Sequence, residues 1–213
     1  MGDVTDWVVG KLSDDKTLQV IDRTSGNLLV IEAKVGYSFI VGVLGVQSVI
    51  ELSDVQPLFA GATRPDLVVN VPSKTLWRGS AINFVHAVPA AFGTFGDIAR
   101  AAQTKAAGVY RDKDMGFFIA GIGQHKNVSS VSYVYDRVFR ANRKDDTSVV
   151  VAVIDAYNMS AEDVRNARDQ LGNFDVVVKS TSYGSITKQA EAAAQSMGAQ
   201  ALKFGQLMQR LAK

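Results

Sequence analysis

The sequence predicts an α/β protein with a mixed central sheet flanked by helices and a β-rich hairpin region at its N-terminus. Apolar and β-branched residues dominate the first part of the chain, which favours strands there. Residues 174–179 form an apolar run between two helical segments, as in a sheet buried on both faces. We therefore expect a β-rich N-terminal region over residues 1–60, separate from or continuous with the same sheet, and an α/β domain over residues 61–213.

Composition excludes several classes of protein. The 213 residues are 47% hydrophobic, which suffices for one large domain or two small ones. The longest apolar run, Phe39–Ile50, is too short to span a bilayer, so we expect no membrane partner. Zero cysteines exclude disulfides and thiolate metal sites, and without a visible signal peptide they favour a cytoplasmic protein. The formal charge of +2 requires no polyanionic partner, and no sequence repeat is visible.

In the first half, apolar runs and turn-forming residues predict a β-hairpin. Thr17–Asp22 and Asn27–Lys34 flank the turn-forming cluster Thr24–Asn27. The other expected segments are a short strand at Trp7–Leu12, a buried helix or strand at residues 37–54, a loop at Pro57–Arg64, a strand at Asp66–Val71 and a mostly helical stretch at residues 80–107.

In the second half, Ser160 and Asp163 predict a helix with a capping box, which ends at Gly172. The other expected segments are strands at Met115–Gly123, Ser130–Asn142, Thr147–Tyr157 and Phe174–Lys179, a helix at Ile186–Met197, a short strand at Ala201–Phe204 and a terminal helix.

Glu32 and Lys34 are the sharpest chemical feature. They are two positions apart on a predicted strand and therefore project from the same face. In a phosphodiesterase such a carboxylate holds a divalent metal that neutralises charge on the phosphate, and the lysine orients or activates water. Carboxylate ligands suit Mg²⁺. The alternative interpretation is the solvated polar face of a half-buried hairpin.

The stretch Leu28–Lys34, with the later Gln47, resembles the PD-(D/E)XK nuclease superfamily, which has the restriction-endonuclease-like fold. Glu32 and Lys34 match its Glu-x-Lys pair, and Gln47 matches a glutamine that follows this pair in several branches. The resemblance covers about residues 15–72. It implies a nuclease of prokaryotic or phage type that acts on nucleic acid with Mg²⁺, with Glu32 as a metal ligand and Lys34 positioning the attacking water.

The family places an aspartate at the start of the preceding strand, across from the Glu-x-Lys pair. If the turn is centred on Ser25 and Gly26, Glu32 pairs with Gln19, and Lys34 pairs with Thr17. Thr17 therefore stands where the resemblance predicts the aspartate.

Two other aspartates lie near this hairpin. In the same register Asp22 pairs with Leu29 on the opposite face, whereas Asp15 lies one step further out on the correct face. We therefore expect Asp15 to be the second catalytic and metal-binding carboxylate beside Glu32. The substitution by Thr17, and the little room for the family's first helix before residue 5, favour instead a non-catalytic module that binds nucleic acid or protein.

A second segment has the order of elements of the same family. Residues 83–180 are expected as helix, strand, strand, strand, helix, strand, which is the order of the PD-(D/E)XK core. Asp136 and Asp155 would lie on consecutive strands, and Lys179 would end a later one. No Asp-x-Lys pair is present, and the alternative for Asp155 is an ordinary residue between strand and helix.

The loop after residue 179 is a candidate phosphate site. Lys179, Ser182, Gly184 and Ser185 combine a positive charge, hydroxyl groups and a glycine before a helix N-terminus. This would make the chain a nucleotide-binding α/β protein. The alternative is ordinary helix capping by Ser185 or Thr187.

A basic and aromatic ribbon is the last candidate for nucleic-acid binding. It is formed by Arg137, Arg140, Arg143 and Lys144 with Tyr133, Tyr135 and Phe139. The alternative is a solvated edge hairpin, because nearby aspartates dilute the charge. His125 is a candidate general base without an identified partner. The Ala- and Gln-rich C-terminal helices leave open a homo-oligomer or a multi-subunit assembly.

Overall fold

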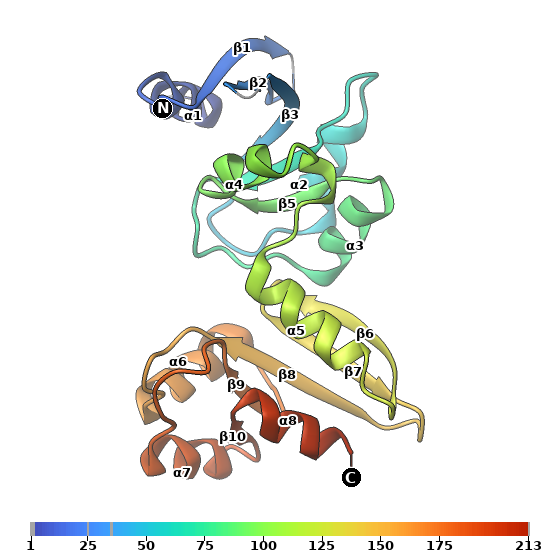
Figure 1. Ribbon diagram of the computed structural model, residues 1–213, viewed down its shortest axis with the longest axis vertical. Helices are drawn as coiled ribbons and strands as arrows, with labels where there is room; N and C mark the ends of the chain where they lie inside the picture. The colour runs from blue at the N-terminus through green and yellow to red at the C-terminus, as the bar shows by residue number, and fades with distance from the viewer. Residues whose placement is uncertain (1–2, 25, 35, 213) are drawn as a thin grey trace. The chain divides into compact units, whose positions relative to one another are not determined.

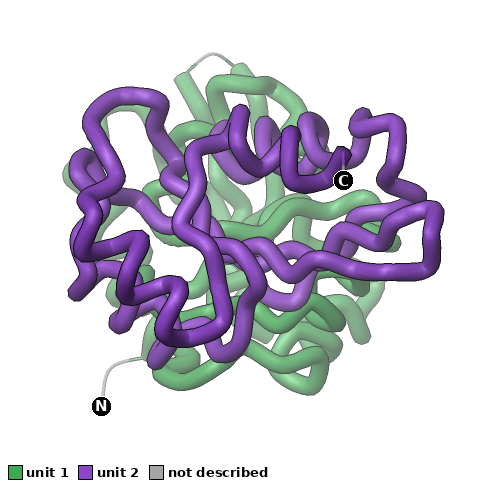
Figure 2. The backbone as a smooth tube through the Cα atoms, turned by 90° about the horizontal axis from the view of Figure 1, so that it is seen from below, with its two compact units in different colours: residues 1–112 green, residues 113–213 purple. Residues whose placement is uncertain are grey.

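The computed structural model describes residues 3–24, 26–34 and 36–212. Ser25, which the sequence places in the hairpin turn, lies outside these residues. The chain forms two units, residues 1–112 and 113–213 (Figures 1 and 2). The boundary expected at residue 60 falls within the first unit, because the strands on its two sides pair in one sheet. The chain is thus an α/β protein with two mixed sheets rather than one central sheet.

The first unit begins with a helix and continues through three strands to alternating helices and strands. Its elements are α1 (Val4–Ser13), β1 (Leu18–Thr24), β2 (Leu28–Ala33), β3 (Tyr37–Leu44), α2 (Leu52–Val55), η1 (Gln56–Phe59), β4 (Leu67–Asn70), α3 (Gly79–Ala87), β5 (Ala91–Thr94), α4 (Asp97–Thr104) and η2 (Ala107–Val109).

The second unit has the same order of helices and strands. Its elements are α5 (Lys113–Gly123), β6 (Val128–Tyr135), β7 (Val138–Arg143), β8 (Ser148–Ile154), α6 (Ala161–Leu171), β9 (Val176–Lys179), α7 (Lys188–Ser196), β10 (Gln200–Leu202) and α8 (Phe204–Leu211). Among the described residues, no helix is long and apolar enough to cross a membrane.

Both five-stranded sheets have one topology. Their orders are β1-β2-β3-β4-β5 and β6-β7-β8-β9-β10. The first three strands of each sheet pair antiparallel, and the last two continue it in parallel. The parallel strands require crossovers, which the intervening helices supply.

In each unit, two corresponding helices cover one face of the sheet. In the first unit, Val8 of α1 and Ile98 of α4 are buried in the core against β2, β3 and β4. In the second, Phe118 of α5 and Leu207 of α8 are buried in the core against β7, β8 and β9. The first and last α-helices of each unit therefore pack on the same face of their sheet. The other helices carry further buried residues, such as Val55 and Val164.

The correspondence between the units extends to single hydrogen bonds. The parallel bridge Ile50–Trp77 recurs as Met159–Ile186, with both residues 109 positions further along. Asp54 Oδ2 accepts a hydrogen bond from the N–H of Glu51, and Asp163 Oδ2 accepts the same bond from Ser160, both at 2.8 Å. The capping box predicted at Ser160 is therefore confirmed.

The start of the fourth strand repeats as well. Asp66 Oδ2 accepts a hydrogen bond from the N–H of Ile40 at 2.8 Å. Asp175 Oδ2 accepts one from the N–H of Val150 at 2.7 Å. In each unit this carboxylate joins the third strand to the fourth. The two halves thus share one backbone design, although the sequence shows no visible repeat.

Two predicted strands are helices. Trp7–Leu12 lies in α1, whose first turn is capped by the Asp3 side chain accepting from the N–H of Thr5 at 3.1 Å. Met115–Gly123 lies in α5. Both segments are rich in β-branched or aromatic residues, and their packing on the sheet overrides that preference. A helix therefore precedes the hairpin, although the sequence predicted little room for one.

Other predicted segments divide differently. Ser130–Asn142 was expected as one strand and forms β6 and β7, with a turn at Asp136 and Arg137. The ambiguous stretch 37–54 forms β3 followed by α2, and the mostly helical stretch 80–107 contains β5 between α3 and α4. The hairpin of β1 and β2 is confirmed.

Candidate functional site

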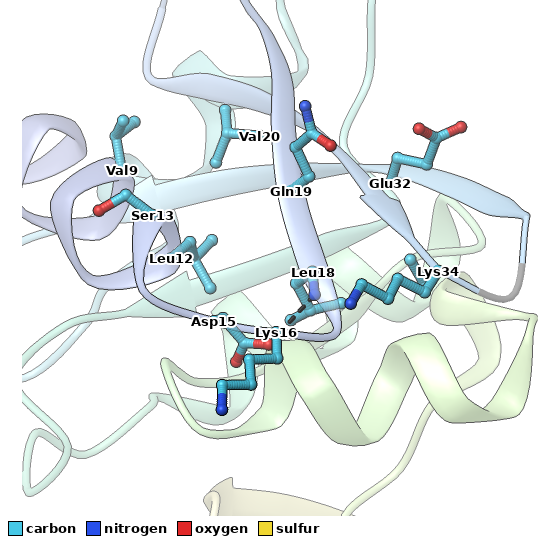
Figure 3. Close-up of a pocket in the computed structure, with 11 residues that line it drawn as sticks. Val9, Leu12, Ser13, Asp15, Lys16, Leu18, Gln19, Val20, Glu32 and Lys34 are labelled. Carbon is cyan, nitrogen blue, oxygen red and sulfur yellow. Dashed lines mark hydrogen bonds between the residues drawn. The ribbon is translucent and has the colours of Figure 1, made fainter.

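The first hairpin borders a hollow of about 450 Å³ between the end of α1 and the strands β1 and β2 (Figure 3). Asp15, Glu32 and Lys34, the three residues predicted to be catalytic, all line it. Lys16 also lines it, although no sequence motif pointed to this residue. The predicted register could have found it, because Lys16 precedes Thr17, the residue placed opposite Lys34.

The predicted register around Glu32 is confirmed. Glu32 pairs with Gln19 across β1 and β2. The N–H of Lys34 donates to the carbonyl oxygen of Thr17 at 3.0 Å, which holds the loop before β1 against the end of β2. This backbone bond brings Lys16 and Lys34 to the same end of the hairpin.

The predicted position of Asp22 is wrong. Asp22 pairs with Val30 instead of Leu29, because the register shifts between Val20 and Asp22. A bulge adds one residue to a strand and so reverses the face of the residues that follow. Asp22 therefore lies on the same face of the hairpin as Glu32, nearer the turn.

Asp15 is held in a local turn. Its Oδ1 accepts hydrogen bonds from the N–H and the hydroxyl of Thr17 at 2.6 and 2.7 Å, and from the N–H of Leu18 at 3.1 Å. These hydrogen bonds, together with the charge of Lys34, lower the pKa of Asp15. The carboxylate is thus ionised and committed to shaping the entry to β1.

Glu32, Lys16 and Lys34 have exposed side chains. Within the described part of the chain, none of the three makes a side-chain hydrogen bond or ion pair. Figure 3 shows the Glu32 carboxyl group directed away from Asp15, while the Lys34 side chain extends across the hollow. The site therefore presents two lysine ammonium groups that no carboxylate neutralises by direct contact.

Magnesium fits these residues poorly. Mg²⁺ prefers several oxygen ligands in near-octahedral geometry. Asp15 Oδ1 already accepts three hydrogen bonds, and the Glu32 carboxyl group lies at the other side of the hollow (Figure 3). Residues 3–24, 26–34 and 36–212 contain no group of three or more His, Asp or Glu side chains that could hold a metal. Metal binding by Asp15 and Glu32 stays a prediction.

The loop after β9 is organised by Lys179, which is 1% exposed. Its ammonium group donates hydrogen bonds to the carbonyl oxygens of Ala156, Tyr157 and Tyr183. A lysine ammonium has three donors, so all of them are used. Lys179 therefore joins the loop after β8 to the loop after β9 and has no donor left for a phosphate.

The other residues of that loop are also engaged. Ser185 donates from its N–H and its hydroxyl to Asn158 Oδ1, at 2.9 and 3.0 Å. Gly184 has φ +75°, and a Cβ there would lie 1.8 Å from the carbonyl oxygen of Tyr157. Thr187 caps α7, as one alternative predicted. Ser182 is exposed. Phosphate binding by Lys179, Ser182, Gly184 and Ser185 stays a prediction that this arrangement does not favour.

The same buried position in the first unit is Asn70, which is also 1% exposed. Its amide bonds to the N–H and carbonyl of Val46 and to the carbonyl of Pro72. An amide in one unit and an ammonium in the other thus hold the same two loops together.

Of the two aspartates that the sequence predicts on strands of the segment 83–180, Asp155 lies close enough to Lys179 for their charges to interact. Asp155 follows β8 and accepts a hydrogen bond from the Ser180 hydroxyl at 3.0 Å. Asp136 lies in the turn between β6 and β7 rather than on a strand.

Comparisons with known proteins identify no relative of this chain. No family model, no curated protein and no solved structure matches the chain.

Proposed function

We propose that this protein is a nucleic-acid-binding module that does not cleave its ligand, built on two units of nuclease-like architecture. The observation that carries the proposal is the pair Lys16 and Lys34, two exposed ammonium groups without hydrogen-bonded carboxylates at the edge of one hollow. Lysine and arginine side chains neutralise the phosphates of a nucleic-acid backbone.

The order of elements supports the nuclease-like architecture. Each unit begins with a helix, three strands, a helix and a strand, which is the order of the PD-(D/E)XK core that the Glu32–Lys34 pair resembles, and continues with a further helix, strand and helix. The poor fit of Asp15 and Glu32 to Mg²⁺ favours binding over cleavage.

Metal-dependent cleavage is a second candidate, which one observation favours. Asp15, Glu32 and Lys34 line the same hollow, as expected for a nuclease site. The predicted cytoplasmic location and any assembly with further subunits stay predictions for either candidate.

A binding and cleavage assay tests both candidates. Fluorescence anisotropy with labelled single- and double-stranded DNA and RNA, over a salt series, compares wild type with Lys16→Ala/Lys34→Ala. We expect the variant to bind about tenfold more weakly and its salt slope to fall by about 2, one per lost phosphate contact. Lys74→Ala/Lys105→Ala is the control, because it removes two exposed charges outside the hollow.

The same samples are incubated with Mg²⁺ and Mn²⁺ and analysed for products. Metal-dependent cleavage that disappears in Glu32→Ala would establish the second candidate in place of the first. No binding by wild type, or an equal loss in the control variant, would rule out the binding proposal.

A further inference from the structure

We infer that the β6–β7 hairpin of the second unit is a second nucleic-acid-binding site, which recognises the sugar–phosphate backbone through Lys126, Arg140 and Lys144. The inference rests on the proposed function for the choice of ligand. Its own evidence is the position of these residues in the second unit.

The backbone around Lys126 and Lys144 repeats that around Lys16 and Lys34. The N–H of Lys144 donates to the carbonyl oxygen of Asn127 at 2.9 Å, as that of Lys34 does to Thr17. Lys126 precedes Asn127 as Lys16 precedes Thr17. The two lysines of each unit are therefore joined by the same hydrogen bond at the same end of the hairpin.

The loop before the hairpin has equivalent backbone and side-chain hydrogen bonds in the two units. The N–H of His125 donates to the carbonyl oxygen of Ile122, as that of Asp15 does to Leu12, both at 3.1 Å. His125 Nδ1 then accepts from the N–H of Asn127 at 3.3 Å. His125 thus takes the turn-forming place of Asp15, which makes it a structural residue and removes one negative charge from the site.

The outer face of the second hairpin replaces acidic and apolar groups by basic and neutral ones. Counting from the equivalent lysines, Asn142 occupies the place of Glu32, and Arg140 that of Val30. The second unit thus keeps both lysines of the first site, but it has no carboxylate in the places of Asp15 and Glu32. A site built for phosphate needs the positive charges alone, so this pattern favours backbone binding over metal chemistry.

Hydroxyl and amide groups complete this face. Asn142 Nδ2 donates to the hydroxyl of Ser130 at 2.9 Å, and Arg140 Nη1 lies 3.5 Å from the hydroxyl of Ser148. These side chains come from three adjacent strands and lie on the same side of the sheet, because directly opposed residues share a face.

Acidic groups near the site are already engaged or lie in the turn. Asp145 accepts from the N–H and hydroxyl of Thr147 and forms an ion pair with Arg143 at 3.2 Å. Asp146, at φ 64°, belongs to the turn that leads to β8. Lys126, Arg140 and Lys144 remain exposed.

Two of the three aromatic residues of the predicted ribbon do not share this face, whereas Tyr135 does, because it pairs with Val138 after a register shift in β6. Phe139 is buried in the core of the second unit, and Tyr133 packs on that core with its ring centroid 5.3 Å from that of Phe139. These two rings therefore offer no stacking surface for bases. We expect binding chiefly through phosphates, without sequence preference.

The test compares paired variants of the full chain by anisotropy with one labelled oligonucleotide. We expect Lys126→Ala/Lys144→Ala to weaken binding about tenfold and to lower the salt slope by about 2. Lys113→Ala/Lys188→Ala, which removes two other exposed lysines of the same unit, is the charge-matched control and should lose markedly less. Circular dichroism confirms that each variant is folded.

A reciprocal exchange at one equivalent position sharpens the test. Asn142→Glu introduces into the second unit the carboxylate that the first unit has, and Glu32→Asn removes it from the first. We expect Asn142→Glu to weaken binding and Glu32→Asn to strengthen it, since both positions border their lysine pairs.

The outcomes separate the two proposals. A loss confined to Lys16→Ala/Lys34→Ala overturns the second site and leaves the first standing. A loss confined to Lys126→Ala/Lys144→Ala supports the second site and overturns the first. Equal losses in Lys126→Ala/Lys144→Ala and its control, or no binding by wild type to any of the four nucleic acids, overturn the inference.

Discussion

Lys179 shows how a buried charge can act as a structural cross-link. Its side chain is almost fully enclosed, and its ammonium group is shared by three carbonyl oxygens from two loops. Burying an ammonium group is costly unless its donors are satisfied, so the three bonds are what make this position tolerable.

We predict that Lys179→Met lowers the free energy of unfolding by about 2 kcal/mol, because it keeps the aliphatic chain but leaves the carbonyls without their donor. Nucleic-acid binding should not change. Thermal and denaturant unfolding measure the first effect and anisotropy the second, with the exposed Lys188→Met as control. A folded, stable variant that has lost binding would instead support the phosphate site at this loop.

The residues of the first site illustrate what sequence alone can provide. The pairing of Glu32 with Gln19 follows from the two-residue period of a strand and could be predicted. The place of Asp22 could not, because a bulge leaves no signal in the spacing. The commitment of Asp15 to three hydrogen bonds from Thr17 and Leu18 also became visible only in the folded loop.

At the scale of elements, the third and fourth strands of each unit are joined by one aspartate. Asp66 and Asp175 each accept a hydrogen bond from a backbone N–H of the neighbouring strand, besides the regular ladder. Such a bond aligns the first pair of parallel strands, whose connection is otherwise a long crossover.

Replacing either aspartate should therefore have the same effect in its own unit. We expect Asp66→Ala and Asp175→Ala each to destabilise the protein by about 1 kcal/mol, the usual contribution of one such bond. Denaturant unfolding of the single and double variants checks this, with Asp169→Ala, at an exposed position of α6, as a comparison. A neutral result for both would show that the ladder alone aligns these strands.

The helices α1 and α5 mark the limit of prediction for elements. Both were expected as strands because short apolar runs with valine, isoleucine or phenylalanine suit either structure. Packing decides in favour of a helix. In α5, a Cβ at Gly121 would lie 2.5 Å from the Phe204 ring, so the glycine lets this ring at the start of α8 pack directly on the helix.

At the scale of the whole molecule, the chain is two versions of one unit. Equivalent hydrogen bonds recur 109 or 110 positions apart, for example Ala91 to Asp66 and Gln200 to Asp175. The repeat was invisible in the sequence because backbone groups make most of these contacts, and backbone bonds constrain side-chain identity weakly.

Amide hydrogen exchange should reveal this repeat. We expect the central strands β2–β4 and β7–β9 to be the most protected segments of their units, and the edge strands β1 and β6 to exchange faster. Exchange followed by mass spectrometry would show two similar protection profiles along the chain. Protection confined to one half would contradict the equivalence of the two units.

The enclosed ammonium of Lys179 has a practical consequence for studying motion. An amine-reactive acylating reagent modifies only lysines that it can reach, so Lys179 becomes labelled when the loops after β8 and β9 separate. Its labelling rate, relative to that of exposed lysines in the same sample, therefore reports how often these loops open in the second unit. In the first unit the equivalent loops are joined by Asn70, whose amide does not react with this reagent. An Asn70→Lys substitution would introduce an amine whose labelling rate reports loop opening in that unit.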